Sequence, residues 1–396
     1  MGSAKHYLVL LSAASSSISL ERSAWSLVAG TIAFSDTSRL PQWVLSSTGG
    51  GSVRYQRRLA GAMLALLLLM AAGCGQAAQR SGVAHDNGPA TTPTRPRPAT
   101  TAPPRTSSTT TTAPRLVGLP TPAALTPIST PALAGEGQWT AAARAVDGQA
   151  ALYVTTLRPE GSNTVAGVAW MDTRLLRATL YSGSISPGQG PWTYTAPVQP
   201  DAALNLVCAF NGGFKLADAK GGYYAESRTF APLVAGAASL VITADGTATV
   251  GEWGRDVSMA PDVVSVRQNL TLLVDGGQPV ASLSPSDTSD WGSTLGGVSQ
   301  VWRSGLGVTA AGALVYVSGP ALNIVQLADL LVRGGAVKAM ELDMNPAWDT
   351  FTFYTPSLGE AASPANGTDL LSSMSGGTTR FFEPSWARDF VTMSAR

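Results

Sequence analysis

The stretch RSGLGVTAAGALVYVSGPALNIVQLADLLVRGGAVKAMELDMN, residues 303–345, decides the fold of this chain. Its first part alternates apolar and small residues around a turn, which predicts a β-hairpin over residues 308–317. A helix should then begin after Asn323 as its N-cap and end at the glycine pair 334–335. One face of that helix is apolar, formed by Ile324, Leu327, Leu330 and Leu331. A buried strand over residues 336–342 completes the unit.

Two carboxylates, Glu341 and Asp343, close this stretch. Because side chains alternate along a strand, both should lie on one face at the end of the last strand. Catalytic groups commonly gather where a strand that follows a helix ends. This strand end is therefore the first candidate reaction centre.

Short strands and turns extend on both sides of this unit. Apolar runs at 150–157, 164–171 and 206–210 predict strands, and Asp245-Gly246 predicts a hairpin between residues 240–243 and 247–250. Residues 267–274 read as one further strand that ends in the turn 275–277. Helical periodicity is scarce. We therefore expect an α+β fold, a single domain of mixed β-sheets with few helices, over residues 136–396.

The first 135 residues have a different composition. Residues 1–52 show no periodicity and are either a disordered tail or the product of a start codon placed too early. Residues 53–74 have the basic, apolar and small-residue regions of an export signal and end in Cys74, as in a bacterial lipobox. Residues 75–135 are rich in Pro and Thr and predict a disordered linker. Cys74 is the expected lipidation site of an extracytoplasmic, membrane-anchored protein; the alternative is an ordinary secretory signal cut near Ala78.

The composition of residues 136–396 excludes several kinds of binding and catalytic site. Residues 136–396 carry 15 Lys and Arg against 22 Asp and Glu, so this region has no basic footprint for nucleic acid. The two histidines, His6 and His85, lie outside it, which excludes a Ser-His-Asp triad and a His-ligated zinc site there. Cys208, within an apolar strand, reads as an inert buried thiol. The sequence indicates no cofactor.

Carboxylates and arginines remain to carry chemistry. A pair of carboxylates suits hydrolysis at an anomeric carbon, and arginine suits a phosphate. A metal-assisted phosphodiesterase stays open as an alternative, with Asp343, Asp275 and Asn345 as oxygen ligands for Ca²⁺ or Mg²⁺.

Three separated motifs carry a resemblance to a known family. Asn211-Gly212-Gly213-Phe214 follows a strand, the segment 303–307 opens a hairpin, and a helix, two glycines and a strand lead to Leu342-Asp343. In order and spacing, residues 205–350 resemble the phosphodiester glycosidase family. The resemblance implies an extracytoplasmic hydrolase of sugar-1-phosphodiesters on cell-envelope glycans or glycolipids.

The resemblance also implies roles for individual residues. Asp343 and Glu341 would share the acid, base or nucleophile roles, Arg303 would contact phosphate, and Asn211 would orient the sugar. The expected substrate-binding set is Arg303, Asn211, Gly212, Gly213, Asn345, Trp348 and Glu226. The chain departs from the family after Asp343, where Met344-Asn345-Pro346-Ala347-Trp348 replaces a glycine-rich loop. That departure keeps a second reading open, an inactive envelope lipoprotein that binds glycans through the same cleft.

Overall fold

The computed structural model describes residues 115–396 except 189 and 295, all within one compact unit of the chain. Our predictions for the start of the chain, the export signal, Cys74 and the linker up to residue 114 lie outside the described residues. Within the described part, no helix has both the length and the apolar character needed to cross a membrane.

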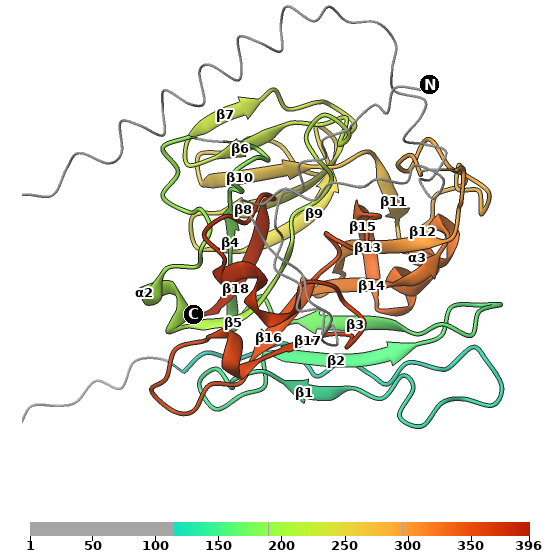
Figure 1. Ribbon diagram of the computed structural model, residues 1–396, viewed down its shortest axis with the longest axis horizontal. Coiled ribbons are helices and arrows are strands. Elements are labelled where there is room, and N and C mark those ends of the chain that lie inside the picture. Colours follow the sequence, from blue (N-terminus) through green and yellow to red (C-terminus); the bar gives the residue numbers. More distant parts are fainter. Residues whose placement is uncertain (1–114, 189, 295) are drawn as a thin grey trace, which may run out of the picture. The chain divides into compact units, whose positions relative to one another are not determined.

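The quoted stretch forms the centre of the largest sheet (Figure 1). A hairpin of β13 (Val301–Thr309) and β14 (Leu314–Leu322) is followed by helix α3 (Ile324–Arg333) and strand β15 (Ala336–Asp343), as predicted. Asn323 caps α3: its side chain accepts a hydrogen bond from the backbone N of Gln326, and the Gln326 side chain accepts one from the backbone N of Asn323. The apolar face of α3 packs in the core of this sheet.

Eight strands make up that sheet, in the order β1-β2-β3-β14-β13-β15-β11-β12. Its other members are β1 (Thr140–Ala142), β2 (Leu152–Leu157), β3 (Ala166–Met171), β11 (Leu272–Asp275) and β12 (Gln278–Pro279). A second sheet has the order β7-β6-β10-β8-β9, and a third β17-β16-β5-β18-β4. The second contains β6 (Tyr223–Ala225), β7 (Arg228–Ala231), β8 (Ala238–Thr243), β9 (Ala248–Glu252) and β10 (Val263–Gln268). The third contains β4 (Leu176–Tyr181), β5 (Leu206–Asn211), β16 (Phe351–Tyr354), β17 (Gly367–Asp369) and β18 (Phe390–Ala395).

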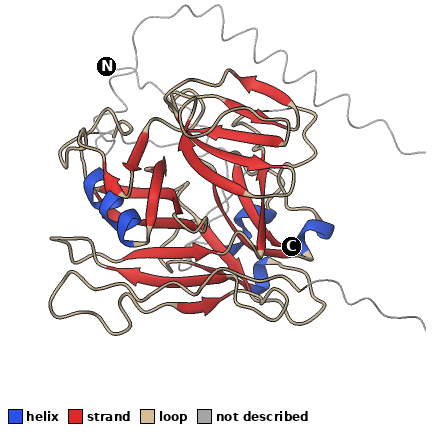
Figure 2. Ribbon diagram, turned by 180° about the vertical axis from the view of Figure 1, so that it is seen from behind, coloured by secondary structure: helices blue, strands red, loops and turns tan. Residues whose placement is uncertain are grey.

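The expectation of mixed sheets was wrong. Every pairing between these named strands is antiparallel. The α+β class also fits only loosely, because among the described residues strands far outnumber helices (Figure 2). Besides α3, the described part has only α2 (Pro200–Ala203) and the 3-10 turns η2 (Pro364–Asn366) and η3 (Gly377–Phe382).

Residues 267–274, predicted as one strand, belong to two. Strand β10 ends at Gln268 in the second sheet, and β11 begins at Leu272 in the first. Between them Leu270 adopts φ +48°, and its backbone N donates to the carbonyl of Ala219 at 2.7 Å. Every residue of this run except Thr271 is buried, although Arg267, Gln268 and Asn269 are polar, and no glycine or proline marks the passage from one sheet to the other.

The folded unit begins earlier than predicted. The backbone N of Leu119 donates to Asp172 Oδ2 at 2.6 Å, and that of Leu125 to the carbonyl of Gly137 at 2.8 Å. Both leucines pack against the core of the large sheet. Residues 115–135, here named the N-terminal strap, therefore belong to the folded unit although their composition is that of a linker. Their backbone donors find side-chain and loop acceptors instead of a strand partner.

Candidate functional site

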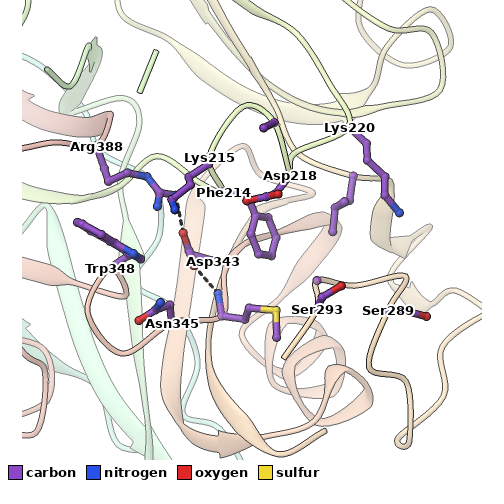
Figure 3. Close-up of a pocket in the computed structure, with 14 residues that line it drawn as sticks. Phe214, Lys215, Asp218, Lys220, Ser289, Ser293, Asp343, Asn345, Trp348 and Arg388 are labelled. Carbon is purple, nitrogen blue, oxygen red and sulfur yellow. Dashed lines mark hydrogen bonds and ion pairs between the residues drawn. The ribbon is translucent and has the colours of Figure 1, made fainter. Parts of the chain in front are cut away.

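Strand β15 delivers Asp343 to a pocket of about 350 Å³. Opposite Leu342 the pairing of β15 with β13 shifts register, so that Ser304 faces Asp343 and Gly305 faces Glu341. The pocket is lined by polar side chains from three further segments of the chain, as Figure 3 shows. Those that bear on its chemistry are Asp343, Asn345, Trp348, Arg388, Lys215, Asp218 and Lys220.

Asp343 forms an ion pair with Arg388. Arg388 Nη2 donates to Asp343 Oδ2 at 2.7 Å, and Asp343 Oδ1 accepts from the backbone N of Met344 at 2.8 Å (Figure 3). The Asp343 residue is only 3% exposed. Burial raises its pKa to about 6, while Arg388 acts in the opposite direction. The carboxyl can therefore gain or lose a proton near neutral pH, as a proton-transfer group must.

The structure separates Glu341 and Arg303 from this pocket. Arg303 Nη1 donates to Glu341 Oε1 at 2.5 Å, and both residues have no exposed surface. Arg303 also donates to the carbonyls of Leu322 and Trp291. Burial raises the pKa of Glu341 to about 8, against the opposing effect of Arg303. Neither residue lines the pocket, so the expected catalytic role of Glu341 and phosphate contact of Arg303 are replaced by a buried ion pair that holds β13 against β15.

Asn211 likewise lies below the surface, in a hydrogen-bonded network. Its Nδ2 donates to Ser304 Oγ at 3.0 Å, and its Oδ1 accepts from the hydroxyl of Tyr316 at 2.9 Å. Ser304 Oγ also lies 2.6 Å from Asp349 Oδ1. Asp349 is fully buried, and its pKa is raised well above the usual value by burial and then by the charge of Asp343. Asn211 thus connects β5, β13 and β14 rather than facing a sugar.

Gly212 and Gly213 are required by backbone packing. A Cβ on Gly212 would lie 2.2 Å from Asp389 Oδ2, and Gly213 has φ +149°. Asp389 is itself buried and accepts from Arg267 Nε at 2.7 Å. Neither glycine lines the pocket, although the carbonyl of Gly213 accepts from Arg388 Nη2 at 2.5 Å. The two glycines bring the backbone close enough to position that arginine.

Two other expected residues lie outside the pocket. The carboxylate of Glu226, in the turn between β6 and β7, accepts from the backbone N of Thr193 and of Tyr194. Asp275, proposed as a metal ligand with Asp343 and Asn345, is instead paired with Lys338 and Arg255. Its strand partner is Lys338, five positions before Asp343 on β15, so the structure does not bring these three oxygen donors together. The described residues contain no group of three or more Asp, Glu, His or Cys side chains placed to hold a metal ion.

Asn345 and Trp348, both expected in the substrate-binding set, line the pocket. Asn345 Oδ1 accepts from the backbone N of Ala347 at 2.9 Å and stabilises the turn through Pro346. The guanidinium of Arg388 lies 4.9 Å from the centre of the Trp348 ring. One face of the indole therefore contacts a cation instead of being free for a sugar.

The sequence patterns did not indicate Arg388, Asp389, Arg267 and Asp349 as members of the site. All four are charged, buried, and distant in sequence from the groups they contact. One signal was available: Arg388-Asp389 directly precedes an apolar strand in a region with few charges. Nothing in the pattern indicated their partners.

Comparison with known proteins gives a distant likeness of fold. No protein family and no curated protein matches the chain. The catalytic domain of zebrafish N-acetylglucosamine-1-phosphodiester alpha-N-acetylglucosaminidase, auto-inhibited by its pro-peptide, is similar with a TM-score of 0.40 and 14% identity, over 65% of this chain and 88% of that chain. A hypothetical protein from Synechocystis is similar with a TM-score of 0.35 and 12% identity, over 64% of each chain. At these scores neither structure assigns a family or an activity, so the function has to be argued from the site itself.

Proposed function

We propose that this protein is a hydrolase that cleaves a sugar-1-phosphodiester at the anomeric carbon, with Asp343 as the base that activates water. One observation supports this most strongly. A nearly buried carboxyl with a pKa of about 6 opens onto a pocket that also contains an arginine, two lysines and an indole. The order of the three sequence motifs, which resembles that of the phosphodiester glycosidases, supports the same substrate class.

The pocket offers one buried carboxylate for catalysis, Asp343, because its other acidic residue, Asp218, is exposed. A water molecule attacks the anomeric carbon and gives its proton to Asp343, while the bond from that carbon to the phosphate oxygen breaks. The phosphate leaves as an anion, so cations can stabilise it where an ordinary glycosidase uses a second carboxyl as acid. Lys215 and Lys220 line the pocket without an ion-pair partner among the described residues and are the cations proposed for this role.

Turnover of α-linked sugar-1-phosphodiesters tests the proposal. The purified protein should release free sugar and a phosphate monoester, and Asp343→Asn should lower kcat by at least about 100-fold, the usual contribution of a general base. Asp329→Asn on the exposed face of α3 is the matched control and should retain full activity. Unchanged turnover in Asp343→Asn would remove that residue from the mechanism.

A second function, glycan binding without turnover, is favoured by a different observation. Both oxygens of Asp343 already accept hydrogen bonds, and the buried carboxyls of Glu341 and Asp349 do not line the pocket. Calorimetric binding of glycan fragments, with no product detected by mass spectrometry and no effect of Asp343→Asn, would establish this function instead.

We also propose that the protein acts outside the cytoplasm, anchored through a lipid on Cys74. The support is the sequence of residues 53–74 alone. In a bacterial host that processes lipoproteins, labelled palmitate should be incorporated into the wild-type protein and not into Cys74→Ser. Incorporation into both proteins would rule out Cys74 as the anchor.

A further inference from the structure

The guanidinium of Arg388 uses only part of its hydrogen-bonding capacity. Nη2 donates to Asp343 Oδ2 and to the carbonyl of Gly213. Nε is buried and has no partner among the described residues, and no described residue accepts from Nη1. A buried N–H group without an acceptor is unfavourable, and a guanidinium presents five donors in a fork that matches an oxyanion. Arg388 is 4% exposed and lines the pocket, so it can offer these donors to a ligand there.

The charges around the pocket favour an anionic ligand. Lys215, Lys220 and Arg388 line it together with Asp218 and Asp343, which leaves one positive charge in excess. The ion pair of Asp343 with Arg388 is a single contact at 2.7 Å from one nitrogen. An incoming anion with several oxygens can therefore compete with the carboxylate for the same guanidinium.

We propose that the anionic group of a ligand displaces Asp343 from Arg388, so that ligand binding itself frees this carboxyl and increases its affinity for a proton. The inference rests on the proposed function and concerns how its base is activated. In the free protein the arginine holds the carboxylate in its charged form. Once the arginine contacts the ligand, the carboxylate loses its counter-ion, gains an anionic neighbour and becomes a stronger base.

Other ionisable groups surround Asp343, and the arginines among them are paired with other carboxyls. Arg267 of β10 is paired with Asp389, and Arg303 of β13 with Glu341 of β15. Two titratable groups also lie nearby, Asp349 on the neighbouring loop and Tyr316 on β14. Burial raises the pKa of each of them. Arg388 is the cation in contact with Asp343. Loss of this contact therefore changes the proton affinity of Asp343 more than any change at the other groups.

Calorimetry with inorganic sulfate tests the displacement. Sulfate is chosen because it stays a dianion across the pH range, whereas a phosphate monoester itself titrates near pH ~6. Titrations at pH 6.5 in two buffers of different ionisation enthalpy should show that the protein takes up protons as sulfate binds. Asp343→Asn should abolish the uptake and bind sulfate several-fold more tightly, since the neutral amide no longer competes for Arg388. Arg388→Lys should weaken binding by about tenfold or more, while the control Arg333→Lys on α3 leaves it unchanged.

The outcomes separate this inference from the proposed reaction. No sulfate binding, uptake that persists in Asp343→Asn, or weaker binding in that variant would each overturn the displacement. Proton-coupled sulfate binding without hydrolysis of any sugar phosphodiester would retain the displacement and reject the reaction. Where turnover occurs, the acidic limb of kcat should lie at higher pH than that of kcat/KM, because the first reports the complex and the second the free protein. Coincident limbs would contradict the inference.

Discussion

Three buried carboxyls of this domain are each held by an arginine. Glu341 is held by Arg303 with no exposed surface, and Asp389 by Arg267 in the same way. Asp343 is held by Arg388 beside the pocket. Glu341 and Asp343 lie two positions apart at the end of one strand, yet they are placed differently: the first connects two strands, and the second lines the pocket.

Replacing Glu341 by Gln should therefore affect stability far more than chemistry. Above about pH 8, where Glu341 carries its charge, removing this partner of the buried ion pair leaves Arg303 uncompensated and typically costs about 3 to 5 kcal/mol. Arg303 keeps its carbonyl partners at Leu322 and Trp291, which places the expected loss near the lower value. Urea denaturation measures the loss, and activity per folded molecule should stay within a few-fold of wild type. A stable variant with abolished turnover would restore Glu341 as a catalytic residue.

At the scale of elements, local patterns predicted structure well and distant contacts poorly. Helix α3 and its N-cap Asn323 lie within consecutive residues, so the sequence alone placed them correctly. The position of Asp343 was predicted for the same reason, since it ends the strand that follows this helix. Arg388 lies 45 residues away on a segment with no motif. Residues 267–274 contain no glycine or proline that would mark their division between two sheets. Which strands pair in a sheet depends on tertiary packing, and the periodicity of the sequence does not indicate the partner strand.

The N-terminal strap also could not be predicted from local pattern, because its composition is that of a linker while distant contacts attach it to the folded unit. Its attachment can be tested. Asp172, 1% exposed, accepts from the backbone N of Leu119 through Oδ2 and from that of Arg174 through Oδ1. Asp172→Asn places an N–H group against one of these donors and should cost about 1 to 3 kcal/mol. Hydrogen exchange at residues 116–125 should then become faster than in wild type, while exchange in α3 changes little. Equal protection of the strap in both proteins would show that Asp172 does not hold it.

For the molecule as a whole, buried carboxyls should set the dependence of stability on pH. The described residues contain no histidine, so no imidazole titrates between pH 5 and 8 in this domain. Burial raises the pKa of Asp343 to about 6 and that of Glu341 to about 8, above the values these groups have in the unfolded chain. The folded state therefore binds more protons than the unfolded state in this window, and the free energy of unfolding decreases as pH rises. Below about pH 4 the opposite trend begins, because Asp245 and Asp256 have lowered pKa values and lose their hydrogen-bonded charged form.

We expect the protein to be most stable near pH 5 and its Tm to be at least about 10 °C lower at pH 8. One pKa unit corresponds to about 1.4 kcal/mol, and for a domain of this size each kcal/mol shifts Tm by about 2 to 4 °C. Calorimetric melting between pH 4 and 9 measures the curve. Asp343→Asn should reduce the change of Tm with pH near pH 6, because it removes the group that titrates there. Glu341→Gln should reduce the change of Tm near pH 8 for the same reason. A Tm that is constant or rises from pH 5 to pH 8 would mean that these carboxyls are fully ionised in the folded protein. In that case Asp343 would not be poised to take up a proton, and its role as a base activated by ligand binding would have to be abandoned.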